Sequence, residues 1–241
     1  MILLTGLDGY RTELVAWSAG FGRLGIATIV LEIPGTGDCP GHPSDPNSGE
    51  RVFASLISWL RAPSSPHLDP SRLVVWGFST GGYHAIRLAH IYPGLAAGFV
   101  SQGGGCHHMF DPAWLDASLG LEYPFDLGLA LAVKFGYGDD FAKFKAEARQ
   151  RFSLLEDGTL DRPCGRLLLV NGTEDEIFPI DDYYLMLTRG SPKEARFVKG
   201  RKHMGEPEAF LVILAWIYER LGLKANPVEQ LKLLPFKARY A

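Results

Sequence analysis

The sequence has few cysteines, no long apolar run and no surplus of positive charge. Cys39, Cys106 and Cys164 are odd in number and form no Cys-x-x-Cys zinc motif, which favours reduced thiols and a cytoplasmic protein. The apolar start at 1–6 is too short for a membrane span or a signal peptide. A net charge of -3, with dispersed lysines and arginines, argues against a nucleic-acid partner.

What the chain does contain is an alternation of apolar strands and helices. Its 241 residues suffice for one substantial core, and we predict a single α/β domain over 1–241. Continuous apolar strands are typical of a mostly parallel sheet with helices on both faces. The predicted strands lie at 2–5, 27–33, 73–76, 98–101, 167–171 and 195–199, and the helices at 12–20, 49–61, 81–91, 181–187 and 207–221.

Residues 104–163 interrupt this alternation. They are rich in aromatic residues and contain no convincing strand, and helices are predicted at 107–119, 123–134 and 138–152. Long inserts in compact domains are often functional, so we predict a lid-like helical insert above a pocket. The alternative is an excursion that only covers apolar surface. The closing residues 224–241 are predicted to form a tail packed on the body.

A serine bracketed by glycines follows the strand at 73–76, in the run Gly77-Phe78-Ser79-Thr80-Gly81. In a Gly-x-Ser-x-Gly elbow the serine lies at a strained strand-to-helix turn that exposes its hydroxyl as a nucleophile. Glycine is needed at 77 and 81 because a side chain at either would collide across the turn. A glycine-rich turn of an unrelated α/β protein is the alternative.

A serine nucleophile needs a base and a carboxylate that orients the base, in the chain order serine, acid, histidine. Among seven histidines, His203 has the required place, after the last predicted strand and before the last predicted helix. A surface histidine is the alternative. Asp175 is the predicted acid, because it lies in the loop after the strand at 167–171; Glu174 and Glu176 remain alternatives.

The oxyanion formed by serine attack needs backbone donors. One is predicted to be the N–H of Thr80, and the other the N–H of Leu7 or Asp8, in the loop after the first strand. Asp8 is equally well explained as a turn former. Residues that could line an aromatic pocket, although each is individually more typical of packing, are Tyr10, Glu32, Phe78, His107, Tyr123 and Tyr137.

No cofactor and no metal site is predicted. The Gly35-Thr36-Gly37 turn lacks the Lys-Ser/Thr pair of a phosphate loop and is more typical of a pocket floor. Adjacent His107 and His108 cannot readily share a metal, and no third ligand stands at a recognisable spacing.

Four segments carry a family likeness, and they lie at 5–13, 32–40, 77–83 and 202–205. Together they resemble the fungal polyketide-shortening α/β-hydrolases of the yellowish-green conidial pigment type, over about 2–223. The resemblance implies a hydrolase that cleaves a carbon-carbon bond of a small-molecule polyketide, an acyl-naphthalene or naphthopyrone, in melanin biosynthesis. By the same resemblance Ser79 is the nucleophile, Asp175 the orienting acid and His203 the base.

Two alternatives stay open. One is an esterase or acyltransferase with the same three residues, and the other is an inactive, truncated protein of the hydrolase fold. The family carries a long N-terminal region, so that the strand at 2–5 would be the third of its sheet and the strand at 27–33 the fourth. We therefore expect the two preceding strands to be missing and the apolar residues 27–31 to form an exposed edge, which could pair two chains into a homodimer.

Overall fold

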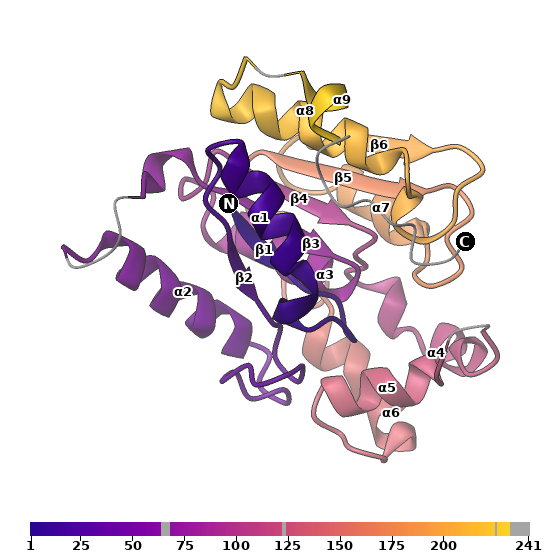
Figure 1. Ribbon diagram of the computed structural model, residues 1–241. Helices are drawn as coiled ribbons and strands as arrows, with labels where there is room; N and C mark the ends of the chain where they lie inside the picture. Colours follow the sequence, from indigo (N-terminus) through magenta and orange to yellow (C-terminus); the bar gives the residue numbers. More distant parts are fainter. Residues whose placement is uncertain (64–67, 122–123, 225, 232–241) are drawn as a thin grey trace.

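A computed structural model describes residues 1–241 except 64–67, 122–123, 225 and 232–241. In this part of the chain six parallel strands form one sheet, in the order β2-β1-β3-β4-β5-β6 (Figure 1). All six predicted strands are present, although β2 is shorter than predicted. The strands are β1 Ile2–Leu4, β2 Ile29–Leu31, β3 Val74–Phe78, β4 Gly98–Gln102, β5 Leu167–Gly172 and β6 Glu194–Val198.

The five helices predicted outside the insert are also present, and α7 has the predicted bounds. The first helix continues past its predicted end at Gly20, because Gly20 and Phe21 are buried and the left-handed turn comes only at Gly25. These helices are α1 Val15–Arg23, after a 3₁₀ turn at Arg11–Leu14, then α2 Ser48–Arg61, α3 Thr80–Ile91, α7 Asp181–Leu187 and α8 Ala209–Leu221.

Helices cover both faces of the sheet, as predicted. Successive strand residues point to opposite faces, so Val75 packs toward α2, α3 and α7, whereas Val74 and Trp76 pack toward α1 and α8. Figure 1 shows α1 and α8 together on one side of the strands. The sheet thus separates two cores, and α3, which follows the candidate nucleophile, belongs to the first of them.

The insert is helical and its described residues contain no strand. Its main helices are α4 Pro112–Ser118, α5 Leu127–Lys134 and α6 Phe141–Phe152, which lie together beyond one end of the sheet in Figure 1. α5 and α6 begin later than predicted because the side chains of Asp126 and Asp140 accept the N–H groups of Leu129 and Lys143 as N-caps. Whether these helices act as a lid remains a prediction.

The predicted tail lies partly outside the described residues. Its described part includes α9 Pro227–Leu231, whose Leu231 packs against the core on the α8 side. Within the described ranges, no helix has both the length and the apolar character needed to cross a membrane.

A buried carboxylate ties α7 to the start of the insert. Asp182 is fully buried, and its Oδ2 accepts the N–H groups of Cys106 and Met109 at 2.9 and 3.2 Å. Its Oδ1 accepts the N–H groups of His107 and His108 at 2.9 and 2.7 Å. One side chain therefore satisfies four backbone donors of the turn that leads from β4 into α4.

Replacing Asp182 by Asn should lower the free energy of unfolding by about 3 kcal/mol, because the amide NH₂ would face N–H donors that have lost their acceptor. The matched control is Asp181→Asn, whose side chain is exposed next door; it should change stability by less than about 0.5 kcal/mol. Urea unfolding of both variants measures the difference. Equal unfolding midpoints would show that the four hydrogen bonds of Asp182 contribute little.

Candidate active site

Ser79 stands at the turn between β3 and α3. Its backbone has φ 50° and ψ -123°, a positive φ that a side chain makes unfavourable. The turn is held because Ser79 N–H donates to the Gln102 carbonyl and Gly82 N–H donates to the Ser79 carbonyl, both at 2.7 Å. The partly exposed hydroxyl thus projects from a strained but well-fastened backbone.

The two glycines of the elbow are required for different reasons. A Cβ on Gly77 would lie 2.1 Å from the Gly81 carbonyl oxygen, so the predicted collision across the turn holds there. A Cβ on Gly81 would instead lie 2.4 and 2.6 Å from the carbonyl oxygens of Thr5 and Leu4. The collision predicted for Gly81 is therefore with the end of β1, because α3 packs directly on that strand.

His203 lies between Ser79 and Asp175. Its Nε2 is 2.8 Å from Ser79 Oγ, and its Nδ1 is 2.9 Å from Asp175 Oδ2. The structure thus brings together the three residues singled out in the sequence, although 124 and 28 positions separate them along the chain. Glu174 and Glu176 are exposed, and Glu176 pairs with Lys202 at 3.2 Å instead.

The Asp175 carboxylate is buried yet ionised. Burial by itself would raise the pKa of Asp175, but the neighbouring His203, the Asn171 amide and the Ile177 N–H hold that pKa below its ordinary value. Asn171 Nδ2 donates at 2.6 Å and Ile177 N–H at 2.7 Å. An acid of this kind fixes the orientation of the imidazole and stabilises its protonated form.

Two buried amide side chains, at the ends of β4 and β5, support the histidine loop. Asn171 Oδ1 accepts the Met204 N–H at 2.9 Å, and Gln102 Nε2 donates to the Met204 carbonyl at 3.1 Å. Met204 needs this support because its φ is 67°. No motif in the sequence marks Asn171 or Gln102 as functional; a polar residue closing an apolar strand is the signal that could have found them.

The loop after β1, which carries the predicted donors Leu7 and Asp8, lies against Ser79. A Cβ on Gly6 would lie 3.4 Å from Ser79 Cβ, which places the loop after β1 against the serine. The Leu7 carbonyl accepts the Thr36 hydroxyl at 2.9 Å, which fixes this loop. Within the described residues the N–H groups of Thr80, Leu7 and Asp8 have no hydrogen-bond acceptor. Such donors are able to bind a developing oxyanion.

Three of the residues predicted to line a pocket lie outside the insert. The first, Tyr10, is 55% exposed. Glu32 is buried, and its carboxylate accepts Arg11 Nη1 at 2.7 Å and the Asp38 N–H at 3.1 Å, so it joins two loops. The Phe78 ring packs against Trp76, with centroids 4.7 Å apart. Phe78 therefore belongs to the core on the α1 side, because alternation along β3 puts it on the same face as Trp76.

The other three candidates lie in or near the insert. The Tyr137 hydroxyl donates to Glu147 and accepts from Arg151, at 2.9 and 2.8 Å. His107 Nδ1 lies 2.7 Å from the Ser153 hydroxyl. Tyr123 lies outside the described residues.

The structure adds Asp111 to the two adjacent histidines as a third group able to bind a metal. The ligand atoms of His107, His108 and Asp111 lie within 4.8 Å of one another. In the folded chain, however, His108 Nδ1 pairs with Asp111 at 2.8 Å, and Arg149 Nη1 pairs with the other carboxylate oxygen at 2.8 Å. A metal would have to displace these partners, so the cluster is better explained as an ion-pair network.

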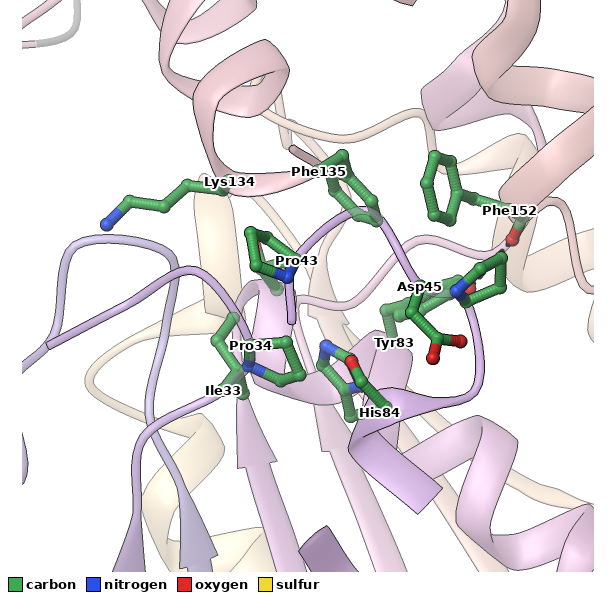
Figure 2. Close-up of a pocket in the computed structure, with 12 residues that line it drawn as sticks. Ile33, Pro34, Pro43, Asp45, Tyr83, His84, Lys134, Phe135 and Phe152 are labelled. Atoms are coloured by element: carbon green, nitrogen blue, oxygen red, sulfur yellow. Dashed lines mark hydrogen bonds between the residues drawn. The ribbon is translucent and has the colours of Figure 1, made fainter. Parts of the chain in front are cut away.

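A small cavity, called here the α3 cavity, lies beside the first turn of α3. Figure 2 shows His84 next to Pro34 and Tyr83, with Phe135 and Phe152 from the insert on the opposite side. Thr80, which follows the candidate nucleophile, contributes to the same wall. The lining residues are Ile33, Pro34, Pro43, Asp45, Pro46, Ser48, Thr80, Tyr83, His84, Lys134, Phe135 and Phe152.

Comparison with solved structures identifies the fold. The protein titled AbyA5 superposes with a TM-score of 0.75 at 21% identity, covering 96% of this chain and 65% of that chain. The 2,6-dihydroxy-pseudo-oxynicotine hydrolase gives a TM-score of 0.70 at 19% identity, covering 94% and 62%. The chain has the α/β-hydrolase fold. It spans less than two thirds of the length of these two proteins.

Sequence comparison adds one partial match. The quorum-quenching protein AidA of Acinetobacter baumannii (strain MDR-ZJ06) is 33% identical over 106 residues, which cover 42% of this chain and 34% of that protein. No protein-family profile matches the chain. In the hydrolase fold the nucleophile, acid and histidine are expected where Ser79, Asp175 and His203 lie, at the carboxyl ends of the strands.

Proposed function

We propose that this chain is a serine hydrolase that cleaves a carbonyl-carbon bond of a polyketide, an acyl-naphthalene or naphthopyrone. The observation that carries the proposal is the continuous contact from Asp175 through His203 to the strained Ser79, near backbone N–H groups that have no acceptor among the described residues. The similar fold of a protein named as the hydrolase of 2,6-dihydroxy-pseudo-oxynicotine supports hydrolysis as the reaction class. The polyketide substrate rests on the four sequence segments that resemble the fungal enzymes.

In the first half of the reaction, His203 Nε2 takes the proton of Ser79 while Oγ attacks the substrate ketone. Asp175 stabilises the imidazolium that forms. The carbonyl oxygen becomes an oxyanion, which the N–H of Thr80 and that of Leu7 or Asp8 bind. Each donor of this kind contributes about 10²- to 10³-fold to the rate.

In the second half, collapse of the tetrahedral intermediate breaks the bond between the carbonyl carbon and the aromatic or enolisable carbon. The carbanion is stabilised by the remaining carbonyl or arene and receives the proton held by His203. The acyl group is left on Ser79. His203 then removes a proton from water, which attacks the acyl-serine, and returns that proton to Ser79 Oγ as the acid is released.

The test is turnover of a matched pair of substrates, an acetylated polyhydroxynaphthalene and an aryl acetate. We expect the ketone to be cleaved to the naphthalene and acetate, by the wild type and not by Ser79→Ala. Chromatography of the products measures both reactions. Turnover of the ester alone would replace the proposal by an esterase, and turnover of neither by folded protein would support an inactive hydrolase-fold protein.

A further inference from the structure

Two loops meet at the edge of the sheet near Ser79. β1 lies between β2 and β3, and Ser79 follows β3 (Figure 1). The loop after β1, at 5–10, carries the two proposed donors Leu7 and Asp8, and the loop after β2, at 32–38, lies on its other side. Residues 5–10 form neither helix nor strand, so their conformation depends on contacts with neighbouring segments.

Two side chains of the loop after β2 hold the loop after β1. The Thr36 hydroxyl donates to the Leu7 carbonyl at 2.9 Å, and Glu32 Oε1 accepts the Arg11 N–H at 3.0 Å. Both Thr36 and Glu32 are buried. A buried hydroxyl that loses its hydrogen-bond partner is destabilising, so the packing of Thr36 favours this one contact.

Thr36 is presented from a fixed backbone. Its N–H donates to the Ile33 carbonyl at 3.0 Å. Gly35 and Gly37, on either side, have φ of 83° and 55°, which a side chain would make unfavourable. The insert packs on the same turn, because a Cβ on Gly35 would lie 2.5 Å from the Lys134 carbonyl oxygen. The position of the hydroxyl is therefore set by the turn and by the insert together.

The Leu7 carbonyl sets the direction of the next N–H along the chain. The Leu7–Asp8 peptide is planar and trans, so the Asp8 N–H points opposite to the Leu7 carbonyl. That carbonyl faces Thr36, and the hydrogen bond from Thr36 therefore holds the Asp8 N–H pointing away from the loop after β2. Ser79 belongs to the other neighbour of β1, and a Cβ on Gly6 would lie 3.4 Å from Ser79 Cβ.

We propose that Thr36 is a positioning residue, whose hydroxyl holds the Leu7–Asp8 peptide in the orientation that lets the Asp8 N–H bind the oxyanion formed at Ser79. This inference rests on the proposed function for Ser79 as the nucleophile. It selects Asp8 over Leu7 as the second donor. It also gives the Gly35-Thr36-Gly37 turn a role in the reaction, without contact between Thr36 and the substrate.

The test measures how fast a fluorophosphonate labels Ser79, a reaction that needs the nucleophile and the oxyanion hole but no ketone. Thr36→Val removes the hydroxyl and keeps the shape of the side chain. It should lower the maximal labelling rate about 30-fold, part of the roughly 10²- to 10³-fold that one donor contributes. The probe concentration at half-maximal rate should not change, because the donors act on the transition state. Thr36→Ser, which keeps the hydroxyl, should be labelled nearly as fast as the wild type.

The matched control is Ser118→Ala, which removes another buried hydroxyl that donates to a backbone carbonyl, that of Leu115 at 2.8 Å in α4. It should leave the labelling rate unchanged. An unchanged rate in Thr36→Val, or an equal loss in Thr36→Ser or in Ser118→Ala, would overturn the role of Thr36. Thermal unfolding shows whether each variant is folded, and Thr36→Ala, which adds no atom, takes the place of a valine variant that is not.

A double substitution tests the route through Asp8. Asp8→Pro removes the N–H, whereas Asp8→Ala removes only the carboxylate. Thr36→Val should slow labelling by less than about threefold when added to Asp8→Pro, but by about 30-fold when added to Asp8→Ala, since two changes to one interaction are not additive. Equal further losses in both would overturn the route through Asp8.

The same measurements distinguish this inference from the proposed function. The expected labelling pattern in a protein whose wild type does not cleave the acetylated naphthalene would support the role of Thr36 and refute the proposed reaction alone. Cleavage by the wild type with no effect of Thr36→Val on labelling would refute the role of Thr36 alone. No labelling of the folded wild type would refute both.

Discussion

Ser79→Ala should reduce the turnover of any substrate by about 10⁶-fold and abolish covalent labelling by a fluorophosphonate. The reason is that, within the described part of the chain, Ser79 Oγ is the hydroxyl that contacts His203 Nε2, at 2.8 Å. The structure should tolerate the change, since the elbow is held by backbone hydrogen bonds of residues 79 and 82. Gel fluorescence with the probe and steady-state kinetics measure the two effects.

The control for this experiment is Ser58→Ala, which keeps the nucleophile and should be labelled like the wild type. Labelling that persists in Ser79→Ala would show that another residue reacts. Circular dichroism shows whether Ser79→Ala is folded. If labelling and the folded state are lost together, Ser79 is needed for folding, and the assignment of Ser79 as the nucleophile is not supported.

Asp175→Asn should lower kcat by about 10⁴-fold, because an amide in this place favours the wrong tautomer of His203 and cannot stabilise its imidazolium. Its matched control is Glu176→Gln, an exposed carboxylate one position away that pairs with Lys202. That control should retain nearly full activity. A small effect of Asp175→Asn, or an equal effect of both variants, would assign the orienting role elsewhere.

The same aspartate makes stability depend on pH. Since the pKa of Asp175 is lowered in the folded protein, its ionised form stabilises the fold at pH values above its unfolded pKa of about 4. That contribution is lost as the pH falls through the lowered pKa. The difference in unfolding free energy between wild type and Asp175→Asn should therefore shrink as the pH is decreased below about 4.

The fold and the spatial grouping of the site could be predicted because both depend on local pattern and chain order. Six apolar runs give six strands, and parallel strands bring their carboxyl ends, with Ser79, Asp175 and His203, to one edge. Asp175 is favoured over its acidic neighbours in the sequence because of its place after the strand at 167–171. In the structure its carboxylate lies 2.9 Å from His203 Nδ1, whereas Glu174 and Glu176 are exposed.

What the sequence did not reveal depends on tertiary contacts. Asn171 and Gln102 act through the backbone of Met204, and Asp182 binds four amides about 75 residues away along the chain. No periodicity encodes such pairings. The hydroxyls of Ser48 and Thr80, which have no hydrogen-bond partner among the described residues, are of the same kind, since only the packing of α2 against α3 brings them to one cavity.

The proposed reaction requires Ser79 to become acylated when a carbonyl-carbon bond is broken. Mass spectrometry of protein quenched in acid during turnover of an acetylated polyhydroxynaphthalene tests it most directly. We expect an added acetyl mass on the peptide that contains Ser79, absent from Ser79→Ala, together with release of the free naphthalene. Release of the naphthalene by Ser79→Ala at the wild-type rate, or an acetyl group on a different residue, would contradict it.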